Sequence, residues 1–251
     1  MASGDDGRRK GEIMSKNISY IKNWMSRLLR TNAGRPETLY DLDSEYHGLF
    51  DRACAEVGIK ESPKRRLRYY TLTKLLHQYE PDDVFVEVGV FKGCSTFQIA
   101  EYLSRFEEPI FYAIDSFEGL SKFTPHDDSD YLKKNQDEVR RSFKCSLEQV
   151  QSNLSSFPFI RFLKGWVPKV FTSLPDQEYS FIHIDVDLYE PAKACADYFY
   201  PKLKPGGCMV FDDYGSAYFP GVRKAVSEFK EGKEDLRIVE CPAGSAIIFK
   251  M

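Results

Sequence analysis

The chain has 251 residues, 42% of them hydrophobic, which is enough to bury the core of one three-layer α/β domain. Its formal charge of -3 offers no general basic surface for nucleic acid. The six cysteines are scattered without a C-x-x-C pair, which argues against a zinc site and favours a reducing, cytoplasmic location. Neither a long apolar run nor a signal-peptide pattern is present, so we expect no stable membrane insertion.

The N-terminal segment differs from the rest of the chain in charge and pattern. Its first 35 residues carry eight Lys and Arg against three acids, and about the first 12 are polar enough to be disordered. Apolar residues then recur at helical spacing from Ile13 to Leu29, which predicts an amphipathic helix with a basic polar face. Such a helix binds a membrane surface or, more often, packs on its own domain or a sister subunit. We assign 1–60 to this arm and its helices, and 61–251 to the main domain.

Two helices are expected at 45–57 and 64–78, and from residue 83 short apolar runs alternate with helical stretches. The apolar runs predict seven strands, at 84–90, 109–115, 159–165, 180–187, 208–213, 236–241 and 245–251. Further helices are expected at 96–103, 135–154, 191–200 and 221–229, and a lid at about 116–134. Continuous apolar strands suit a mainly parallel sheet that is buried on both faces. The predicted fold is α/β and Rossmann-like, with helices on both faces of the sheet and an N-terminal helical arm.

A glycine-containing turn follows the first predicted strand. From Glu87 to Ser95 the sequence reads EVGVFKGCS, with Gly89 and Gly93 four residues apart. Small residues at such a turn let a ligand approach the backbone near a helix N-terminus, although a tight turn also needs glycine when no ligand binds. The pattern is neither the G-x-G-x-x-G of dinucleotide binders nor a phosphate-binding loop.

An acid ends the second predicted strand. Asp115 lies 28 residues after Glu87, where carboxylates in nucleotide-binding folds accept hydrogen bonds from a ribose; a solvated strand-end carboxylate is the alternative. The E-x-G-x-x-x-G turn followed by this acid resembles the signature of class I S-adenosylmethionine-dependent methyltransferases. The resemblance implies a cofactor site formed by Glu87, Gly89, Phe91, Cys94, Ser95, Asp115, Ser116, Gly165 and Trp166. Trp166 fits the adenine edge of that site and a core aromatic equally well.

Paired acids end the fourth and fifth predicted strands. Asp185 and Asp187 follow one strand, and Asp212 and Asp213 follow the next. Carboxylates gathered at one edge of a sheet repel each other unless a cation compensates them. Ligation by oxygen alone is typical of Mg²⁺, whereas an Asp-Asp step by itself also occurs as a helix N-cap or a solvated turn. With Asp185 on the neighbouring strand, we expect a metal site.

A metal at these acids could activate a hydroxyl group that accepts a methyl group. Coordination lowers the pKa of an acceptor hydroxyl and fixes its direction, and in-line methyl transfer then needs positioning and a base. Asp187 points to the same edge as Asp185 and is the candidate base, with His126 in the lid as the alternative. His183 lies deeper on the same strand, where a hydrogen-bonded core histidine is more usual.

Several longer stretches resemble the TylF/MycF group of macrocin-type sugar O-methyltransferases. They are VEVGVFKGCSTFQIA, YAIDSFEGL, PGVRKAVSEF and, most specifically, HIDVDLYEP followed by GGxxxFDDYG. The resemblance covers about 69–251. It implies Mg²⁺-dependent methyl transfer from S-adenosylmethionine to a hydroxyl of a sugar on a glycan, glycolipid or glycosylated natural product, by a homo-oligomer. It also implies Asp185, Asp212 and Asp213 as metal ligands and Asp187 as general base.

Three other functions share some of these features. A catechol-type small-molecule O-methyltransferase shares the metal arrangement, although its lysine base is not evident. A Rossmann NAD-dependent oxidoreductase is suggested by Tyr189-x-x-x-Lys193, but Pro191 between them marks the start of a helix, and the glycine pattern does not match. A module that binds a partner through the basic arm without catalysis is disfavoured by the intact strand-end acids.

Overall fold

The computed structural model describes residues 38–134, 136–233 and 236–251. Contacts divide the chain into a unit that ends at Asp43 and a second unit from Ser44 to Met251. In the first unit, α2 (Leu39–Leu42) begins with a capping box, in which the Thr38 hydroxyl accepts from the Asp41 N–H and the Asp41 carboxylate accepts from the Thr38 N–H. The amphipathic helix predicted between Ile13 and Leu29 lies outside the described residues.

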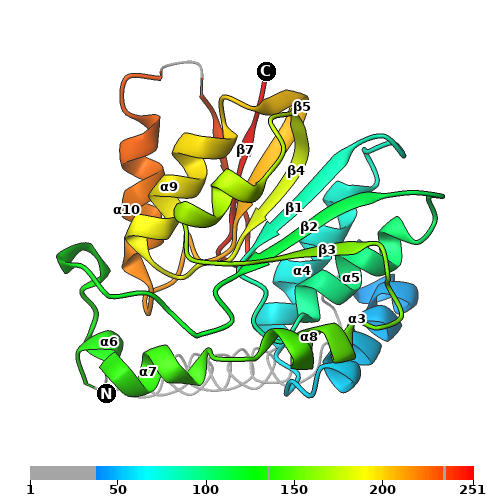
Figure 1. Ribbon diagram of the computed structural model, residues 1–251, viewed down its shortest axis with the longest axis horizontal. Coiled ribbons are helices and arrows are strands. Elements are labelled where there is room, and N and C mark those ends of the chain that lie inside the picture. Colours follow the sequence, from blue (N-terminus) through cyan, green and yellow to red (C-terminus); the bar gives the residue numbers. More distant parts are fainter. Residues whose placement is uncertain (1–37, 135, 234–235) are drawn as a thin grey trace, which may run out of the picture. The chain divides into compact units, whose positions relative to one another are not determined.

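A seven-stranded sheet in the order β3-β2-β1-β4-β5-β7-β6 forms the centre of the second unit (Figure 1). The strands are β1 (Val84–Val88), β2 (Ile110–Asp115), β3 (Ile160–Lys164), β4 (Tyr179–Ile184), β5 (Leu203–Phe211), β6 (Ile238–Glu240) and β7 (Ala246–Phe249). The first five are parallel, and β7 runs antiparallel to β5 and β6. The predicted seven-stranded, mainly parallel α/β fold is therefore confirmed.

The central strands are buried on both faces because helices cover both. Val86, Ile182 and Met209 lie side by side across β1, β4 and β5 and pack into the core that includes α9 and α10. On the opposite face Phe85 and Phe181 contact each other and the ring of Tyr79, which follows α4. Each apolar run thus supplies two cores by its alternating side chains.

The helices of the second unit are α3 (Ser44–Glu56), α4 (Pro63–Leu76), α5 (Cys94–Leu103), α6 (Asp130–Lys134), α7 (Gln136–Ser142), α8 (Leu147–Asn153), α9 (Tyr189–Phe199) and α10 (Pro220–Lys230). Figure 1 shows α9 and α10 on one side of the sheet and α3, α4 and α5 on the other. Within the described part of the chain, none of the helices has the length and apolar character needed to cross a bilayer.

The single helix predicted at 135–154 was wrong. The structure has two helices there, α7 and α8, because Ser146 starts a new one: its hydroxyl accepts a hydrogen bond from the Gln149 N–H at 3.2 Å. Serine is a favoured N-cap, and its extended backbone interrupts the helical path. The predicted lid at 116–134 contains a 3₁₀ turn (Pro125–Asp127) followed by α6.

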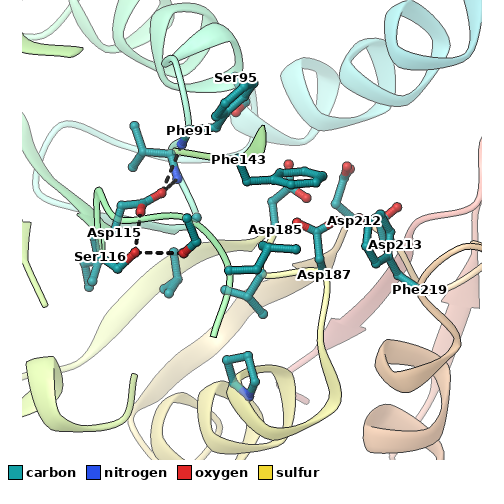
Figure 2. Close-up of a pocket in the computed structure, with 18 of the residues that line it drawn as sticks. Phe91, Ser95, Asp115, Ser116, Phe143, Asp185, Asp187, Asp212, Asp213 and Phe219 are labelled. Carbon is teal, nitrogen blue, oxygen red and sulfur yellow. Dashed lines mark hydrogen bonds between the residues drawn. The ribbon is translucent and has the colours of Figure 1, made fainter. Parts of the chain in front are cut away.

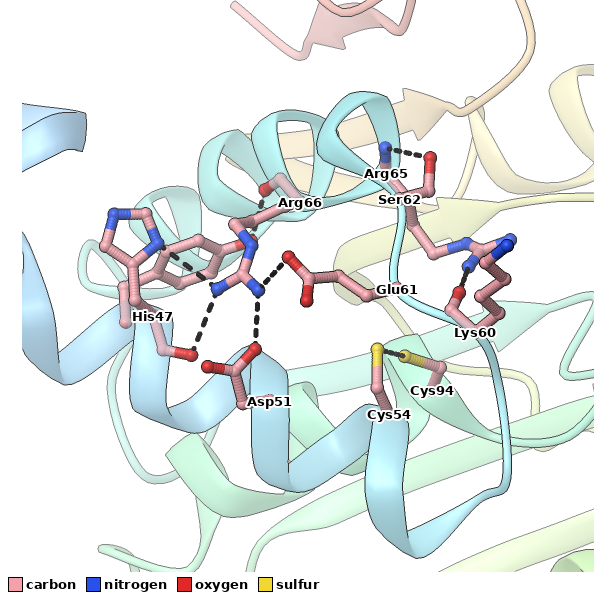
Figure 3. Close-up of polar contacts among 10 residues, drawn as sticks. His47, Asp51, Cys54, Lys60, Glu61, Ser62, Arg65, Arg66 and Cys94 are labelled. Atoms are coloured by element: carbon pink, nitrogen blue, oxygen red, sulfur yellow. Dashed lines mark hydrogen bonds and ion pairs between the residues drawn. The ribbon is translucent and has the colours of Figure 1, made fainter.

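The helices α3 and α4 are joined by the side chain of Arg66 (Figure 3). Its guanidinium donates to the carboxylates of Asp51 and Glu61 and lies over the Phe50 ring at 4.5 Å. In addition, α3 contacts α5 through an ion pair between Arg52 and Glu101. The helix α3 is thus part of the unit that begins at Ser44.

The start of β1 is tied to β4 and β5 by the buried carboxylate of Asp83. It accepts hydrogen bonds from the Ser180 hydroxyl and the Lys204 ammonium, both at 2.6 Å, and from the Glu80 N–H at 2.8 Å. Burial raises the pKa of Asp83, but the bonds to Lys204 and Ser180 outweigh it and hold the pKa below its ordinary value. The charged form therefore stabilises the fold.

We expect Asp83→Asn to lower the free energy of unfolding by about 1.5–3 kcal/mol near neutral pH, the range for hydrogen bonds to a charged group. A carboxylate with a lowered pKa stabilises the fold above its unfolded-state pKa, and this contribution is lost as the pH falls through the folded-state pKa. Urea denaturation at several pH values should show the difference from wild type shrinking in acid. Asp82→Asn, at the exposed neighbouring position, is the control; an equal effect there would contradict the assignment.

Candidate active site

The carboxyl ends of the parallel strands face a cavity of about 380 Å³ (Figure 2). Twelve of the fourteen predicted site residues line it: Gly89, Phe91, Cys94, Ser95, Asp115, Ser116, Gly165, Trp166, Asp185, Asp187, Asp212 and Asp213. Figure 2 shows Asp115 and Ser116 on one side of the cavity and the four strand-end aspartates on the other. Glu87 and His126 are not among the lining residues.

The turn after β1 packs directly against the backbone that presents Asp185. Gly89 has φ +93, and a Cβ built there would lie 1.9 Å from the Asp185 carbonyl oxygen. The Asp185 N–H also donates to the carbonyl of Val88 at 2.8 Å. Close packing of the turn on β4 is thus sufficient to require glycine, and the same contact couples the two sides of the cavity.

Asp115 holds the loops around its side of the cavity. One carboxylate oxygen accepts from the N–H groups of Val90 and Phe91 at 2.7 and 3.0 Å, and the other accepts from the Phe117 N–H at 2.7 Å. Phe91 and Phe117 both have left-handed backbones, with φ of 51 and 58. Such conformations persist where surrounding bonds hold them, so Asp115 keeps both loops in place at this side of the cavity.

Glu87 lies behind the cavity wall. It is fully buried, accepts from the Thr96 hydroxyl at the start of α5, and contacts the His183 Nδ1 at 2.9 Å. Burial lowers the pKa of His183, but Asp212 and Glu87 outweigh it and raise the pKa to about 10. His183 Nε2 is buried without a hydrogen-bond partner and lies 3.7 Å from Asp212 Oδ1. Glu87 therefore positions the imidazole next to the strand-end acids and favours its protonated form.

The strand-end acids form two overlapping groups. Ligand atoms of His183, Asp185 and Asp212 lie within 4.8 Å of one another, and so do those of Asp185, Asp187 and Asp213. Burial and the neighbouring carboxylates raise the pKa values of Asp185 and Asp187 well above the ordinary range. Asp187 also has a left-handed backbone, with φ of 62. Burial and the neighbouring acids thus disfavour the ionised forms of Asp185 and Asp187, and a nearby positive charge would favour them.

Arg68 supplies a positive charge beside these acids, and no sequence pattern predicts this role. Its Nη1 donates to Asp212 Oδ2 and lies 3.4 Å from Asp213 Oδ1. Burial raises the pKa of Asp212, yet Arg68 and His183 together hold it below its ordinary value. Arg68 lies on α4, 144 residues before Asp212, in a stretch with several similar basic residues, and so no local pattern distinguishes it.

The lid is anchored by Asp127, a second residue that sequence reasoning missed. Its buried carboxylate accepts from the Thr124 N–H at 2.8 Å and from the Tyr189 N–H, at the start of α9, at 2.7 Å. The ring of the adjacent His126 contacts the Tyr189 ring in a tilted arrangement, with centroids 4.2 Å apart, and its Nδ1 lies 2.7 Å from the Lys224 ammonium. His126 is therefore engaged outside the cavity lining.

Aromatic side chains border the cavity near the acids. Phe143 contacts Phe91 and Phe219, with ring centroids 5.8 and 5.9 Å apart, and all three line the cavity. Tyr218, also in the lining, is 60% exposed. Trp166 lines the cavity and is 37% exposed. It is therefore not a buried core residue, which was the second of the two alternatives for this side chain.

We expect Gly89→Ala to destabilise the protein by about 2–6 kcal/mol, because left-handed strain and overpacking each cost roughly 1–3 kcal/mol. Gly58→Ala is the matched control, since Gly58 also has a positive φ, +63, but nothing within 4 Å of its Cβ position. Urea denaturation of both variants separates the two effects. Equal losses would show that the contact with Asp185 carries no cost of its own.

Solved structures share the fold. The O-methyltransferase NovP aligns with a TM-score of 0.60 at 21% identity, over 75% of this chain and 79% of NovP. The calicheamicin methyltransferase CalS11 aligns with a TM-score of 0.57 at 18% identity, over 82% of this chain and 93% of CalS11. The predicted methyltransferase fold is thus confirmed.

Relatives with known activity match in sequence over about three-fifths of their own length. The mycinamicin III 3''-O-methyltransferase of Micromonospora griseorubida is 28% identical over 60% of this chain and 61% of the relative. The 8-demethyl-8-(2,3-dimethoxy-alpha-L-rhamnosyl)-tetracenomycin-C 4'-O-methyltransferase of Streptomyces olivaceus is 27% identical over 64% of this chain and 62% of the relative. The family model for macrocin O-methyltransferase matches residues 63–240, and the chain therefore belongs to the TylF macrocin-O-methyltransferase family.

Proposed function

We propose that the protein transfers a methyl group from S-adenosylmethionine to a hydroxyl of a sugar, on a glycosylated natural product, glycan or glycolipid, with the help of Mg²⁺. The observation that carries the proposal is one cavity with two chemically different sides. The β1 turn and Asp115 lie on one side, and four aspartates lie on the other (Figure 2). Membership of the TylF family supports methyl transfer, and the names of two relatives specify O-methylation, one of them on a rhamnosyl compound.

In this proposal the Asp115 side holds the cofactor. Asp115 accepts from the Val90 and Phe91 N–H groups at Oδ2, and from the Phe117 N–H at Oδ1. The ribose diol would bind at Oδ1 in place of the Ser116 hydroxyl, whose contact is long at 3.4 Å. Trp166 is exposed enough to offer a flat apolar face to the adenine. The remaining contacts come from cavity-lining residues of the turns after β1, β2 and β3: Gly89, Phe91, Cys94, Ser95, Ser116 and Gly165.

The opposite side fits a hard divalent cation. Asp185, Asp187 and Asp213 each place an oxygen within 4.8 Å of the others, and oxygen donors suit Mg²⁺. We assign Asp185, Asp212 and Asp213 as the ligands, as the TylF resemblance implies; Asp185 shares one close group with Asp213 and another with Asp212. A bound cation would lower the pKa of the acceptor hydroxyl and fix its direction.

Asp187 is the proposed general base. Its side chain is buried in the cavity wall and lies in the same close group as Asp185 and Asp213. In the ionised form it would accept the proton of the acceptor hydroxyl. The left-handed backbone at Asp187 aims the side chain in a way that an extended strand end would not. His126 is less suitable, because it contacts Tyr189 and Lys224 outside the cavity lining.

The oxidoreductase alternative is not supported by the geometry. The Tyr189 hydroxyl donates to Glu228, and the Lys193 ammonium pairs with Asp197 at 3.0 Å. Neither Tyr189 nor Lys193 lines the cavity. The proposal also includes a reducing, cytoplasmic location, which is supported by six unbridged cysteines.

Mass spectrometry on a panel of deoxysugar acceptors tests the proposed reaction. We expect the mass increment of one methylene group with S-adenosylmethionine, and loss of this product when EDTA removes the cation. Calorimetry should show S-adenosylhomocysteine binding and no NAD(H) binding. Tight NAD(H) binding without methyl transfer would overturn the proposal.

The role of Asp187 is tested by Asp187→Asn, which retains the shape of the side chain but cannot accept the proton. Turnover should fall by about 10²–10⁴-fold, the usual contribution of a positioned base. Affinity for S-adenosylhomocysteine should be unchanged, since Asp187 lies on the acid side of the cavity. His126→Gln is the matched variant, and a larger loss there than in Asp187→Asn would move the base to the lid.

A further inference from the structure

Arg68 binds carboxylates that the proposed function assigns to the cation. Its side chain is 14% exposed, and its Nη1 donates to Asp212 Oδ2 and lies 3.4 Å from Asp213 Oδ1. Asp212 and Asp213 are two of the three proposed ligands. A guanidinium and a divalent cation therefore have overlapping partners at this edge of the sheet.

Both oxygens of Asp212 are engaged by groups of the protein. Oδ1 faces His183 Nε2 at 3.7 Å, and Oδ2 accepts from Arg68. Among the described residues, Asp212 forms a close ligand group with His183 and Asp185, and Asp213 forms another with Asp185 and Asp187. The trio of Asp185, Asp212 and Asp213 is not one of these groups, so Asp212 would have to move for the trio to converge on one ion, and Arg68 holds one of its oxygens.

Electrostatics oppose the simultaneous presence of both cations. A guanidinium that remained in contact with Asp212 would lie close to a doubly charged ion, and like charges repel strongly in a partly buried site. Arginine keeps its charge at any physiological pH, so it cannot avoid this repulsion by losing a proton. One of the two cations must therefore leave the carboxylates.

Arg68 is also held less completely than its neighbour on α4. Arg66 donates to Asp51, Glu61 and the His47 carbonyl and stacks on Phe50, which makes it a structural clamp (Figure 3). The Nε of Arg68, in contrast, is buried without a hydrogen-bond partner. An unsatisfied donor reduces the net gain of docking and makes the displacement of Arg68 less costly.

We propose that Arg68 is an intramolecular competitor of the divalent cation, which holds Asp212 and Asp213 until the ion displaces it. This inference rests on the cation site of the proposed function. The apparent affinity for the cation then includes the cost of removing the guanidinium, so a higher cation concentration is needed to fill the site. Arg68 is thus a positioning residue that keeps neighbouring carboxylates together and sets the cation concentration at which the site assembles.

Calorimetric titration with Mn²⁺ or Mg²⁺ alone tests the competition on the full chain. Arg68→Met removes the charge while keeping an unbranched apolar stem, and we expect it to bind the cation about 10–100-fold more tightly than wild type, the range for one charge-assisted hydrogen bond. Arg68→Lys keeps the positive charge but lacks the planar guanidinium, so its cation affinity should lie between those of wild type and Arg68→Met.

Arg65→Met is the matched control for the charge of the cavity. Arg65 lies on the same helix and lines the same cavity, but its guanidinium donates to the Lys60 carbonyl and not to the acids (Figure 3). We expect its cation affinity to stay within about threefold of wild type, as for a partly exposed charge away from the ligands. An affinity of Arg68→Met no higher than that of Arg65→Met would overturn the competition.

Thermal denaturation gives a second readout that does not depend on turnover. Without added cation, Arg68→Met should melt below wild type because Asp212 loses its partner, and Mn²⁺ should raise its Tm by more than that of wild type. Equal Mn²⁺ shifts in the two proteins, or no cation binding by either, would contradict the inference. S-adenosylhomocysteine binding by the same samples tests the cofactor site of the proposed function separately. Failure of the Arg68 competition can therefore be distinguished from failure of the proposed function.

Discussion

Four carboxylates meet where β4 and β5 end, and their mutual repulsion is the constraint that the surrounding structure must balance. Asp185 shares a close group with His183 and Asp212 and another with Asp187 and Asp213. Water that would screen these charges is largely excluded, since Asp187, Asp212 and Asp213 are buried. Within the described residues, the imidazole of His183 and the guanidinium of Arg68 on α4 both contact Asp212 and offset part of this repulsion. In the proposed function, a divalent cation would offset the repulsion that remains.

The same constraint explains the buried pair beneath the cavity. Glu87 is Cα partner to His183 across β1 and β4, and its carboxylate faces the imidazole and the Thr96 hydroxyl. A carboxylate at this depth would be costly without those partners. The glutamate therefore belongs to the charge balance of the site, and it connects the acids to the start of α5, where the turn after β1 ends.

The turn after β1 contacts both sides of the cavity. Gly89 contacts the carbonyl of Asp185, and Asp115 accepts hydrogen bonds from the backbone of the same turn. A ligand that orders the turn therefore acts on the backbone that presents an acid. For methyl transfer, this arrangement would keep the donor and the acceptor in one fixed relation, which is the main requirement of an in-line displacement.

The sequence by itself determined the strands, their parallel arrangement and the acids at their ends, because side-chain periodicity and strand-end position are local properties. It also brought Asp115, Asp185, Asp187, Asp212 and Asp213 to one edge, since parallel strands share their carboxyl ends. The prediction of one helix at 135–154 was wrong, because the N-cap Ser146 divides this stretch into two helices and one serine is a weak local signal. Only the tertiary structure decided that Glu87 lies behind the cavity, that His126 faces Tyr189, and that Arg68 reaches Asp212. Those contacts join residues far apart in the chain, and packing between helices and sheet, which no local pattern encodes, brings them together.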